Sequence, residues 1–151
     1  MTTDFSTFLT QKPEVQGFFD TATNTISYVV ADPATKHCAI IDSVMDFEPN
    51  GAAISFESAD AMVDYIKEYG LMVEWILETH VHADHLSAAP YLRHKLGGQI
   101  AIGEHIVAVQ RVFGKIFNAG NDFRRDGSDF DRLWSDGDRF SIGGIEVTVL
   151  H

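Results

Sequence analysis

The sequence predicts a mixed α+β fold, with short β-strands near the N-terminus and helices that alternate with strands after them. Two observations support this class: β-rich runs separated by turn residues come first, and stretches with apolar residues at helical spacing follow. With 151 residues, of which 45% are hydrophobic and 22% charged, the chain is long enough to bury one core.

Three short β-rich runs open the chain, at Val15–Asp20, Thr25–Ala31 and His37–Ile41. Turn-forming Asn24 and the Asp32-Pro33 pair separate them. Because consecutive strands joined by short turns usually pair with each other, we expect an antiparallel meander.

Three segments show the spacing of helices. Ser58-Ala59-Asp60 is expected to begin the first helix, which Gly70 ends, and the others cover Ala88–Leu96 and Glu104–Phe117. We expect the apolar side chains of the first and third helices to face the core: Ala61, Met62, Tyr65, Ile66 and Tyr69 in the first, and Ile106, Val109, Val112, Phe113 and Ile116 in the third.

The remaining segments are a strand at Gln99–Ile102, a long polar connection at Asn118–Asp131, and a hairpin. The hairpin places Arg139–Ile142 and Ile145–Leu150 on either side of a Gly143-Gly144 turn. Long connections often form binding loops, so we expect the aromatic residues in or beside this one to pack over the core or line a pocket mouth: Phe123, Phe130 and Trp134.

The most informative segment is THVHADH, residues 79–85. It follows a strand-like run, Glu74–Thr79, and precedes the second helix, so it forms a strand-to-helix loop, a common place for catalytic groups. Imidazole nitrogens bind Zn, Fe, Mn or Co, and a carboxylate adds a harder oxygen ligand or a base. The segment therefore predicts a metal site with four candidate ligands, His80, His82, Asp84 and His85.

The spacing of these four residues allows two metal positions. His80 and His82 are two residues apart and can point to the same side of extended backbone, while Asp84 and His85 turn toward a neighbouring point. The alternative is that they are unrelated surface histidines. Chance clustering is improbable with only seven histidines in the chain.

At these residues the sequence resembles the metallo-β-lactamase fold superfamily, whose shared motif is His-x-His-x-Asp-His. The continuation, residues 86–93 with Leu96-Gly97-Gly98, is similar to the branch that holds persulfide dioxygenases and bacterial β-lactamase-like hydrolases. Weaker similarity extends to Ala39-Ile40-Ile41-Asp42 and to Asp136-Gly137-Asp138. The resemblance implies a four-layer αββα sandwich.

The resemblance further implies an iron-dependent enzyme with one Fe(II) per chain. His80 would be a ligand of a two-histidine, one-carboxylate set, and glutathione persulfide would be oxidised to sulfite with release of glutathione. His82, Asp84 and His85 would then be outer groups, among which Asp84 and His85 are the candidate catalytic residues that position ligands and handle protons.

Two other functions stay open on the same motif. In a dinuclear zinc hydrolase of thioesters or lactones, similar to glyoxalase II, His80 and His82 would hold one of two Zn ions and Asp84 and His85 the other. The residues after the motif, Leu86-Ser87-Ala88-Ala89, favour the sulfur branch over that one. The third reading is a noncatalytic fragment or binding module that keeps the motif without a complete site.

The resemblance also bears on domain organisation. Its remaining ligands, a histidine and an aspartate, would follow His151, so residues 1–151 are expected to be the N-terminal part of a single domain whose C-terminal half is missing from the sequence. Without that half a large apolar face would be exposed, and association into homo-oligomers is one expected consequence.

Composition excludes several partner classes. A net charge of −11 argues against nucleic acid and against anionic membrane surfaces, and no run of about 18 apolar residues predicts a transmembrane helix. Met1–Gln11 lacks the basic start and apolar core of a signal peptide, and a single cysteine, Cys38, excludes an internal disulfide. We therefore expect a cytoplasmic protein. The resemblance implies that it acts on a small-molecule thiol or persulfide.

Four further residues have competing interpretations. Asp42, at the end of the third strand, either supports a ligand histidine or begins a turn, and the resemblance favours support. Cys38 is expected to be a small buried hydrophobe. Arg124 and Arg125 are interpreted as solvated charges in preference to a binding site for the carboxylates of a thiol such as glutathione.

Overall fold

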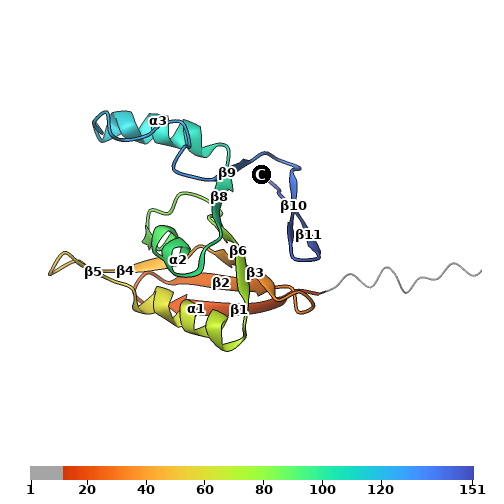
Figure 1. The fold of residues 1–151 in the computed structure, drawn as a ribbon. Helices are drawn as coiled ribbons and strands as arrows, with labels where there is room; N and C mark the ends of the chain where they lie inside the picture. Colours follow the sequence, from red (N-terminus) through yellow and green to blue (C-terminus); the bar gives the residue numbers. More distant parts are fainter. Residues whose placement is uncertain (1–11) are drawn as a thin grey trace, which may run out of the picture.

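The computed structural model describes residues 12–151, so the prediction about Met1–Gln11 lies outside the described residues. Figure 1 shows strands and helices in a mixed arrangement, as predicted. The largest sheet has the order β1-β2-β3-β6-β8-β9, with bounds β1 Glu14–Asp20, β2 Thr25–Ala31, β3 His37–Ile41, β6 Met72–Leu77, β8 Gln99–Gly103 and β9 Arg132–Trp134.

The direction of the strands decides where the loops meet. Strands β1, β2 and β3 form the predicted antiparallel meander, whereas β3, β6, β8 and β9 run parallel to their neighbours. Because the carboxyl ends of parallel strands lie at one edge of a sheet, the residues that follow β3 and β6 are brought together there. Asp42 and the THVHADH segment are those residues.

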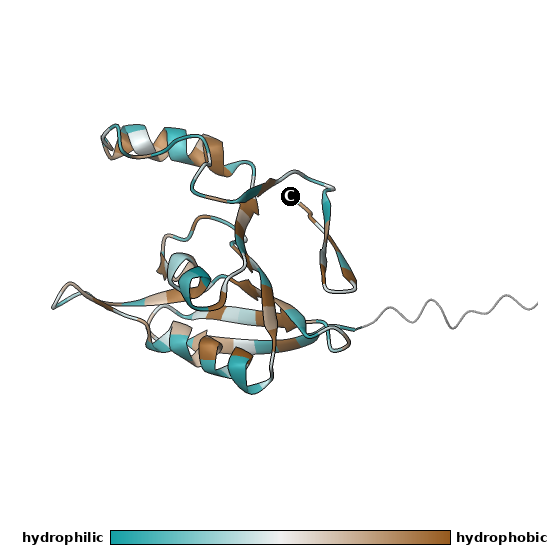
Figure 2. Cartoon of the chain, in the orientation of Figure 1, coloured by the Kyte–Doolittle hydropathy of each residue, from teal (hydrophilic) through white to brown (hydrophobic). Residues whose placement is uncertain are grey.

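Two helices, α1 (Glu57–Glu68) and α2 (Ala89–Leu96), cover the sheet and complete one core. Figure 2 shows hydrophobic residues running through β6 and β8, next to α2. Ile40, Met62, Ile66, Ile76 and Leu92 are the largest apolar side chains buried there, and each contributes about 1.5–3 kcal/mol through burial.

The prediction for the first helix is confirmed in part. Met62 and Ile66 are buried as expected, together with Ala59 and Val63, but Ala61 and Tyr69 are exposed. The helix begins one residue earlier than expected. Its first turn is capped by Asp46, whose carboxylate accepts hydrogen bonds from the Ser58 backbone N–H at 2.9 Å and the Ser58 hydroxyl at 2.5 Å.

Asp46 belongs to a small second sheet that the sequence analysis did not predict. Its strands are β5 (Ala53–Ser55), β4 (Val44–Glu48) and β7 (Leu86–Ser87), in that order. Met45-Asp46-Phe47-Glu48 alternates apolar and polar residues, but only over four positions before the Pro49-Asn50-Gly51 turn, so the strand signal is short. β9 was also missed, because three residues are too few to show alternation.

The prediction for the third helix is wrong for three residues. α3 (Ile106–Ile116) leaves Val112 53%, Phe113 46% and Ile116 64% exposed. Figure 1 shows the reason, since α3 lies away from the large sheet. Its buried residues, Ile106, Gln110 and Gly114, form a different stripe, and the Gln110 side-chain oxygen accepts a hydrogen bond from the Gly127 backbone N–H at 2.9 Å.

The C-terminal hairpin of β10 (Arg139–Ile142) and β11 (Ile145–Thr148) is confirmed. Its turn is attached to the large sheet by two carboxylates. Asp32 Oδ2 accepts from the Gly144 backbone N–H at 2.7 Å, and Glu74 Oε2 accepts from the Gly143 backbone N–H at 2.8 Å. The Trp75 indole N–H also donates to the Ser141 carbonyl, at 2.9 Å.

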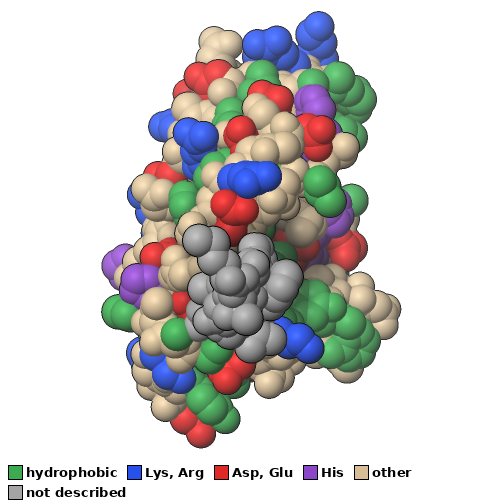
Figure 3. Space-filling model, turned by 90° about the vertical axis from the view of Figure 1, so that its right-hand side faces the viewer, with side chains coloured by type: hydrophobic (Ala, Val, Ile, Leu, Met, Phe, Trp, Pro, Cys, Tyr) green, Lys and Arg blue, Asp and Glu red, His purple; other side chains and the backbone are tan. Residues whose placement is uncertain are grey.

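The prediction for Cys38 is confirmed, whereas that for Arg125 is wrong, because Arg125 is half-buried and donates to the Ala119 carbonyl at 2.7 Å. Cys38 is fully buried, and burial raises the pKa of its thiol to about 12, which keeps it neutral and unreactive. Figure 3 shows acidic and basic side chains interspersed over one face of the molecule. Among the described helices, none has the length and apolar character needed to cross a membrane.

Candidate metal centre

The candidate site lies where β3 and β6 end. Asp42 follows β3 with φ +50, a left-handed conformation that turns the chain sharply away from the sheet. The loop of residues 78–85 follows β6, and the Asp42 backbone N–H donates to the Leu77 carbonyl at 2.9 Å. The two segments are therefore fixed against each other by backbone as well as by side chains.

His80 is oriented through a short chain of hydrogen bonds. The Thr79 hydroxyl donates to Asp42 Oδ2 at 2.6 Å, so its oxygen can only accept from the His80 Nδ1–H, 2.8 Å away. This places the ring proton on Nδ1 and leaves the lone pair of Nε2 available. His80 is exposed, so that nitrogen is accessible to a metal.

His82 is held by carboxylates. Its Nε2 lies 2.9 Å from Asp42 Oδ1 and 3.3 Å from Glu78 Oε2, and its side chain is only 8% exposed. One Asp42 carboxylate therefore contacts His82 directly and His80 through Thr79. Asp42 thus has the supporting role that the resemblance favoured, and it also offers an oxygen of its own beside the two rings.

Asp84 and His85 are positioned by Thr25, the first residue of β2. The Thr25 hydroxyl donates to Asp84 Oδ2 at 2.9 Å and lies 3.3 Å from His85 Nδ1. The His85 side chain is completely buried, whereas the Asp84 side chain is 51% exposed. The structure therefore presents a rigid imidazole and an accessible carboxylate side by side, with 3.5 Å between Asp84 Oδ1 and His85 Nδ1.

Two groups of donor atoms result, and His82 belongs to both. The ligand atoms of Asp42, His80 and His82 lie within 4.8 Å of one another, and so do those of His82, Asp84 and His85. The His82 ring centroid is 4.3 Å from that of His80 and 4.2 Å from that of His85. All four residues singled out in the sequence thus converge on one place.

The His85 ring gives a direct test of whether a metal fits. Within the described part of the chain, its Nε2 is buried and has no hydrogen-bond partner. A buried polar atom left unpaired costs about 1–3 kcal/mol, and a metal ion would satisfy it. The nitrogen and carboxylate donors around it are the set that Fe(II) and Zn prefer, so the residues present fit a metal of this kind.

Electrostatics keep the groups in forms that suit such a site. Burial lowers the pKa of His85, with the nearby His82 adding to the effect, so the ring stays neutral and able to bind a metal. The hydrogen bond from Thr25 lowers the pKa of Asp84, which keeps it ionised. Burial raises the pKa of Glu78 to about 7, against the opposing effect of a 2.5 Å hydrogen bond from Ser87.

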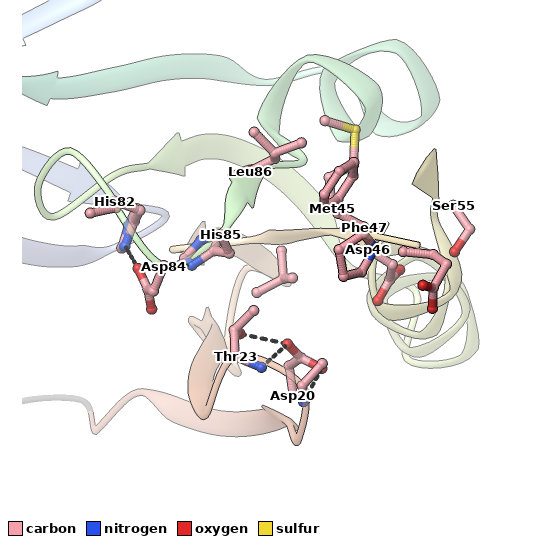
Figure 4. Close-up of a pocket in the computed structure, with 15 residues that line it drawn as sticks. Asp20, Thr23, Met45, Asp46, Phe47, Ser55, His82, Asp84, His85 and Leu86 are labelled. Atoms are coloured by element: carbon pink, nitrogen blue, oxygen red, sulfur yellow. Dashed lines mark hydrogen bonds and ion pairs between the residues drawn. The ribbon is translucent and has the colours of Figure 1, made fainter. Parts of the chain in front are cut away.

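Two cavities flank the motif loop and share three of its residues, His82, Ala83 and His85, together with Leu86 of β7. The first, of about 710 Å³, lies between the motif loop, the β1–β2 turn and β4. Figure 4 shows His82, Asp84 and His85 on one loop, facing the turn that carries Asp20 and Thr23. The second, of about 1010 Å³, lies between the motif loop and α3.

Sequence reasoning missed two members of the site, Thr25 and Glu78. Neither lies in the motif. A threonine at the start of a strand or a glutamate after the end of one does not indicate a functional site until the arrangement of the strands in the sheet is known. The histidines outside the motif stay outside the site. His94 is exposed on α2, and His105 contacts His151, which lies next to Gly103 at the end of β8.

Comparison with known proteins gives one family. The sequence profile of the metallo-beta-lactamase superfamily matches residues 20–151. A probable metallo-hydrolase of Burkholderia pseudomallei is 53% identical over 137 residues, which cover 91% of this chain and 47% of the relative. A Dictyostelium discoideum protein named glyoxylase B2 is 42% identical over 143 residues, which cover 94% of this chain and 49% of the relative.

Two further matches concern a sulfur enzyme. Persulfide dioxygenase ETHE1 of Homo sapiens is 30% identical over 80 residues, which cover 53% of this chain and 27% of the relative. The crystal structure of ETHE1 from Myxococcus xanthus superposes with a TM-score of 0.60 at 22% identity, covering 88% of this chain and 45% of that one. The chain thus spans about half the length of the Burkholderia and Dictyostelium relatives.

Proposed function

The chain belongs to the metallo-beta-lactamase superfamily. We propose that its motif residues contribute to a metal site at which a low-molecular-weight persulfide, such as glutathione persulfide, is oxidised. The observation that carries this proposal is that the motif residues differ in how their ligand atoms are hydrogen-bonded within the protein. His82 and Asp84 are bonded to protein partners, whereas His80 is oriented by Thr79 and keeps an accessible nitrogen. This division supports His80 as the iron ligand and His82 and Asp84 as outer groups.

A bound Fe(II) would supply adjacent open positions for O₂ and for the sulfur of the substrate. The reaction is balanced as persulfide plus O₂ plus water giving thiol, sulfite and two protons. The terminal sulfur is oxidised and O₂ is reduced, and the bond between the two sulfur atoms breaks. His80 would hold the metal, and Asp84 and His85 beside it would accept and pass on the protons released.

The second candidate is a dinuclear zinc hydrolase of thioesters or lactones. The observation that favours it is the presence of two donor groups that share His82, together with the relatives named as a metallo-hydrolase and a glyoxylase. Zinc would polarise the carbonyl and lower the pKa of a water molecule. Asp84 would then be a ligand that also orients the water.

Turnover of the full-length gene product separates the two chemistries. With glutathione persulfide and alkyl persulfides under air, we expect sulfite to form with equal uptake of O₂, and no hydrolysis of thioesters above the uncatalysed rate. Thioester or lactone hydrolysis without O₂ uptake would overturn the proposal in favour of the zinc hydrolase. The same preparation treated with a chelator serves as the control.

A further inference from the structure

The β1–β2 hairpin brings one hydroxyl into contact with two motif residues at once. Thr25 pairs with Asp20 in the last residue pair before the turn, so its backbone is fixed within the sheet. Its hydroxyl oxygen lies 2.9 Å from Asp84 Oδ2 and 3.3 Å from His85 Nδ1. These two residues are the proposed proton-handling pair, so the direction of each hydrogen bond decides what they can do.

The turn of this hairpin is held by the Asp20 carboxylate. It accepts hydrogen bonds from the Ala22 N–H at 3.2 Å and the Thr23 N–H at 3.0 Å, and its Oδ2 accepts from the Thr23 hydroxyl at 2.5 Å. Figure 4 shows this turn opposite the loop that carries Asp84. Because the Thr23 hydroxyl is also 3.0 Å from that of Thr25, the turn supports the Thr25 side chain from the side away from the motif.

The Thr25 hydroxyl has a single proton and several neighbours that could accept it. Asp84 Oδ2 is nearer than the Thr23 oxygen or the His85 ring, and it is ionised at neutral pH. Hydrogen bonds to an ionised acceptor are roughly twice as strong as those between neutral groups. The proton therefore points to Asp84, and the Thr25 oxygen is left to act as an acceptor.

The proton of the His85 ring is fixed by the same contacts. Its Nδ1 faces two oxygens that can only accept, the Thr25 hydroxyl oxygen at 3.3 Å and Asp84 Oδ1 at 3.5 Å. A ring nitrogen between two acceptors carries the proton, so the neutral ring has Nδ1–H and a lone pair on Nε2. That lone pair belongs to the buried atom for which the described residues supply no hydrogen-bond partner.

We propose that Thr25 is a positioning residue for the reaction: its hydroxyl holds the Asp84 carboxylate in place and keeps the His85 proton on Nδ1, so that Nε2 stays free as an acceptor at the metal site. Thr25 is not among the residues that line the two cavities beside the motif loop, so it acts through Asp84 and His85. This inference rests on the proposed function for the reaction that it serves, whereas the assigned tautomer is independent of the substrate.

Nitrogen NMR of the full-length gene product, labelled at histidine and freed of metal, reads the tautomer directly. We expect His85, identified by the loss of its resonances in His85→Gln, to carry its proton on Nδ1. Thr25→Val removes the hydroxyl and keeps a β-branched side chain in the strand. Asp84 Oδ1, at 3.5 Å, is too far for an ordinary hydrogen bond, so the Nε2–H form should then appear. A proton on Nε2 in the wild-type protein would overturn the inference.

Kinetics of the iron-loaded full-length gene product give the second readout. Thr25→Val should lower kcat by roughly 10-fold or more, the usual loss when a supporting partner is removed, with KM and iron content unchanged. Thr25→Ser retains the hydroxyl and should recover most of kcat together with the Nδ1 proton. Thr21→Val is the matched control, because Thr21 is an exposed threonine in the same turn, and it should change neither readout.

The outcomes separate this inference from the proposed function. Wild-type kcat in Thr25→Val, or a Thr25→Ser variant that keeps its iron but not its kcat, would contradict the positioning role while sulfite formation by the wild-type protein still supports the proposed function. If no persulfide gives sulfite, the proposed function fails instead. The NMR comparison of wild-type protein, Thr25→Val and Thr25→Ser then still decides whether Thr25 sets the tautomer of His85.

Discussion

Among single residues, Asp42 does the most to organise the candidate site. Its two carboxylate oxygens contact His82 and the Thr79 hydroxyl, and through Thr79 it also fixes the tautomer of His80. A left-handed backbone at this position, φ +50, is tolerated because several hydrogen bonds determine it. Supporting carboxylates of this kind raise the basicity of a histidine ligand.

His80→Ala tests which residue holds the metal. Removal of this ring should lower iron affinity by roughly 100-fold or more, since loss of a supporting partner alone typically costs 10–100-fold. His94→Ala removes an exposed histidine on α2 and should leave iron content unchanged. Iron and zinc would be measured by elemental analysis after anaerobic purification. Normal iron content in His80→Ala would remove this residue from the ligand set.

At the scale of secondary-structure elements, the attachment of the β10–β11 hairpin has a specific steric requirement. Gly143 adopts φ +57, and a Cβ there would lie 2.6 Å from Asp32 Oδ2 and nearer still to the Thr35 hydroxyl. Asp32 is fully buried and accepts hydrogen bonds from Gly144 and Thr35. A side chain at Gly143 would therefore disturb the carboxylate that holds the hairpin.

Gly143→Ala should lower the free energy of unfolding by about 3 kcal/mol, because it adds backbone strain and leaves Asp32 with broken hydrogen bonds. Gly137→Ala is a matched control. Gly137 also has a positive φ, +79, but a Cβ there meets nothing within 4 Å, so backbone strain alone predicts a loss of about 1 kcal/mol. Urea unfolding of the full-length gene product measures both. Equal losses would show that the contact with Asp32 and Thr35 is unimportant.

The elements that the sequence predicted well are those whose signal is local. The meander of β1–β3 follows from short turns, and the THVHADH segment brings its four candidate ligands within a few residues of one another. The features that the sequence did not predict depend on partners that are distant in the sequence. Thr25 enters the site only because β2 lies beneath the motif loop, and Asp46 caps α1 only because β4 lies beside it.

The burial of the third helix also depends on which segments pack against it. Its apolar spacing correctly predicted a helix, but the pattern cannot say whether the apolar stripe faces a core or a cavity. Phe113 and Val112 are exposed because the buried stripe packs on the loop of residues 118–131 instead. Of the three residues placed wrongly, Phe113 lines the cavity between the motif loop and α3, whereas Val112 and Ile116 do not.

At the scale of the whole molecule, the chain spans about half the length of the Burkholderia and Dictyostelium relatives, and the activity proposed for it belongs to the full-length gene product. The described residues contribute all the groups discussed above, with His80 as the proposed iron ligand. The number and kind of metal ions bound per chain distinguish the two proposed chemistries before any substrate is tested.

The most direct measurement is therefore elemental analysis of the full-length gene product, purified without oxygen or chelators. One iron per chain is the expected result, because the geometry at His80, His82 and Asp84 supports a single ligand with outer groups around it. Two zinc ions per chain would contradict persulfide oxidation and would assign the site to hydrolysis of thioesters or lactones.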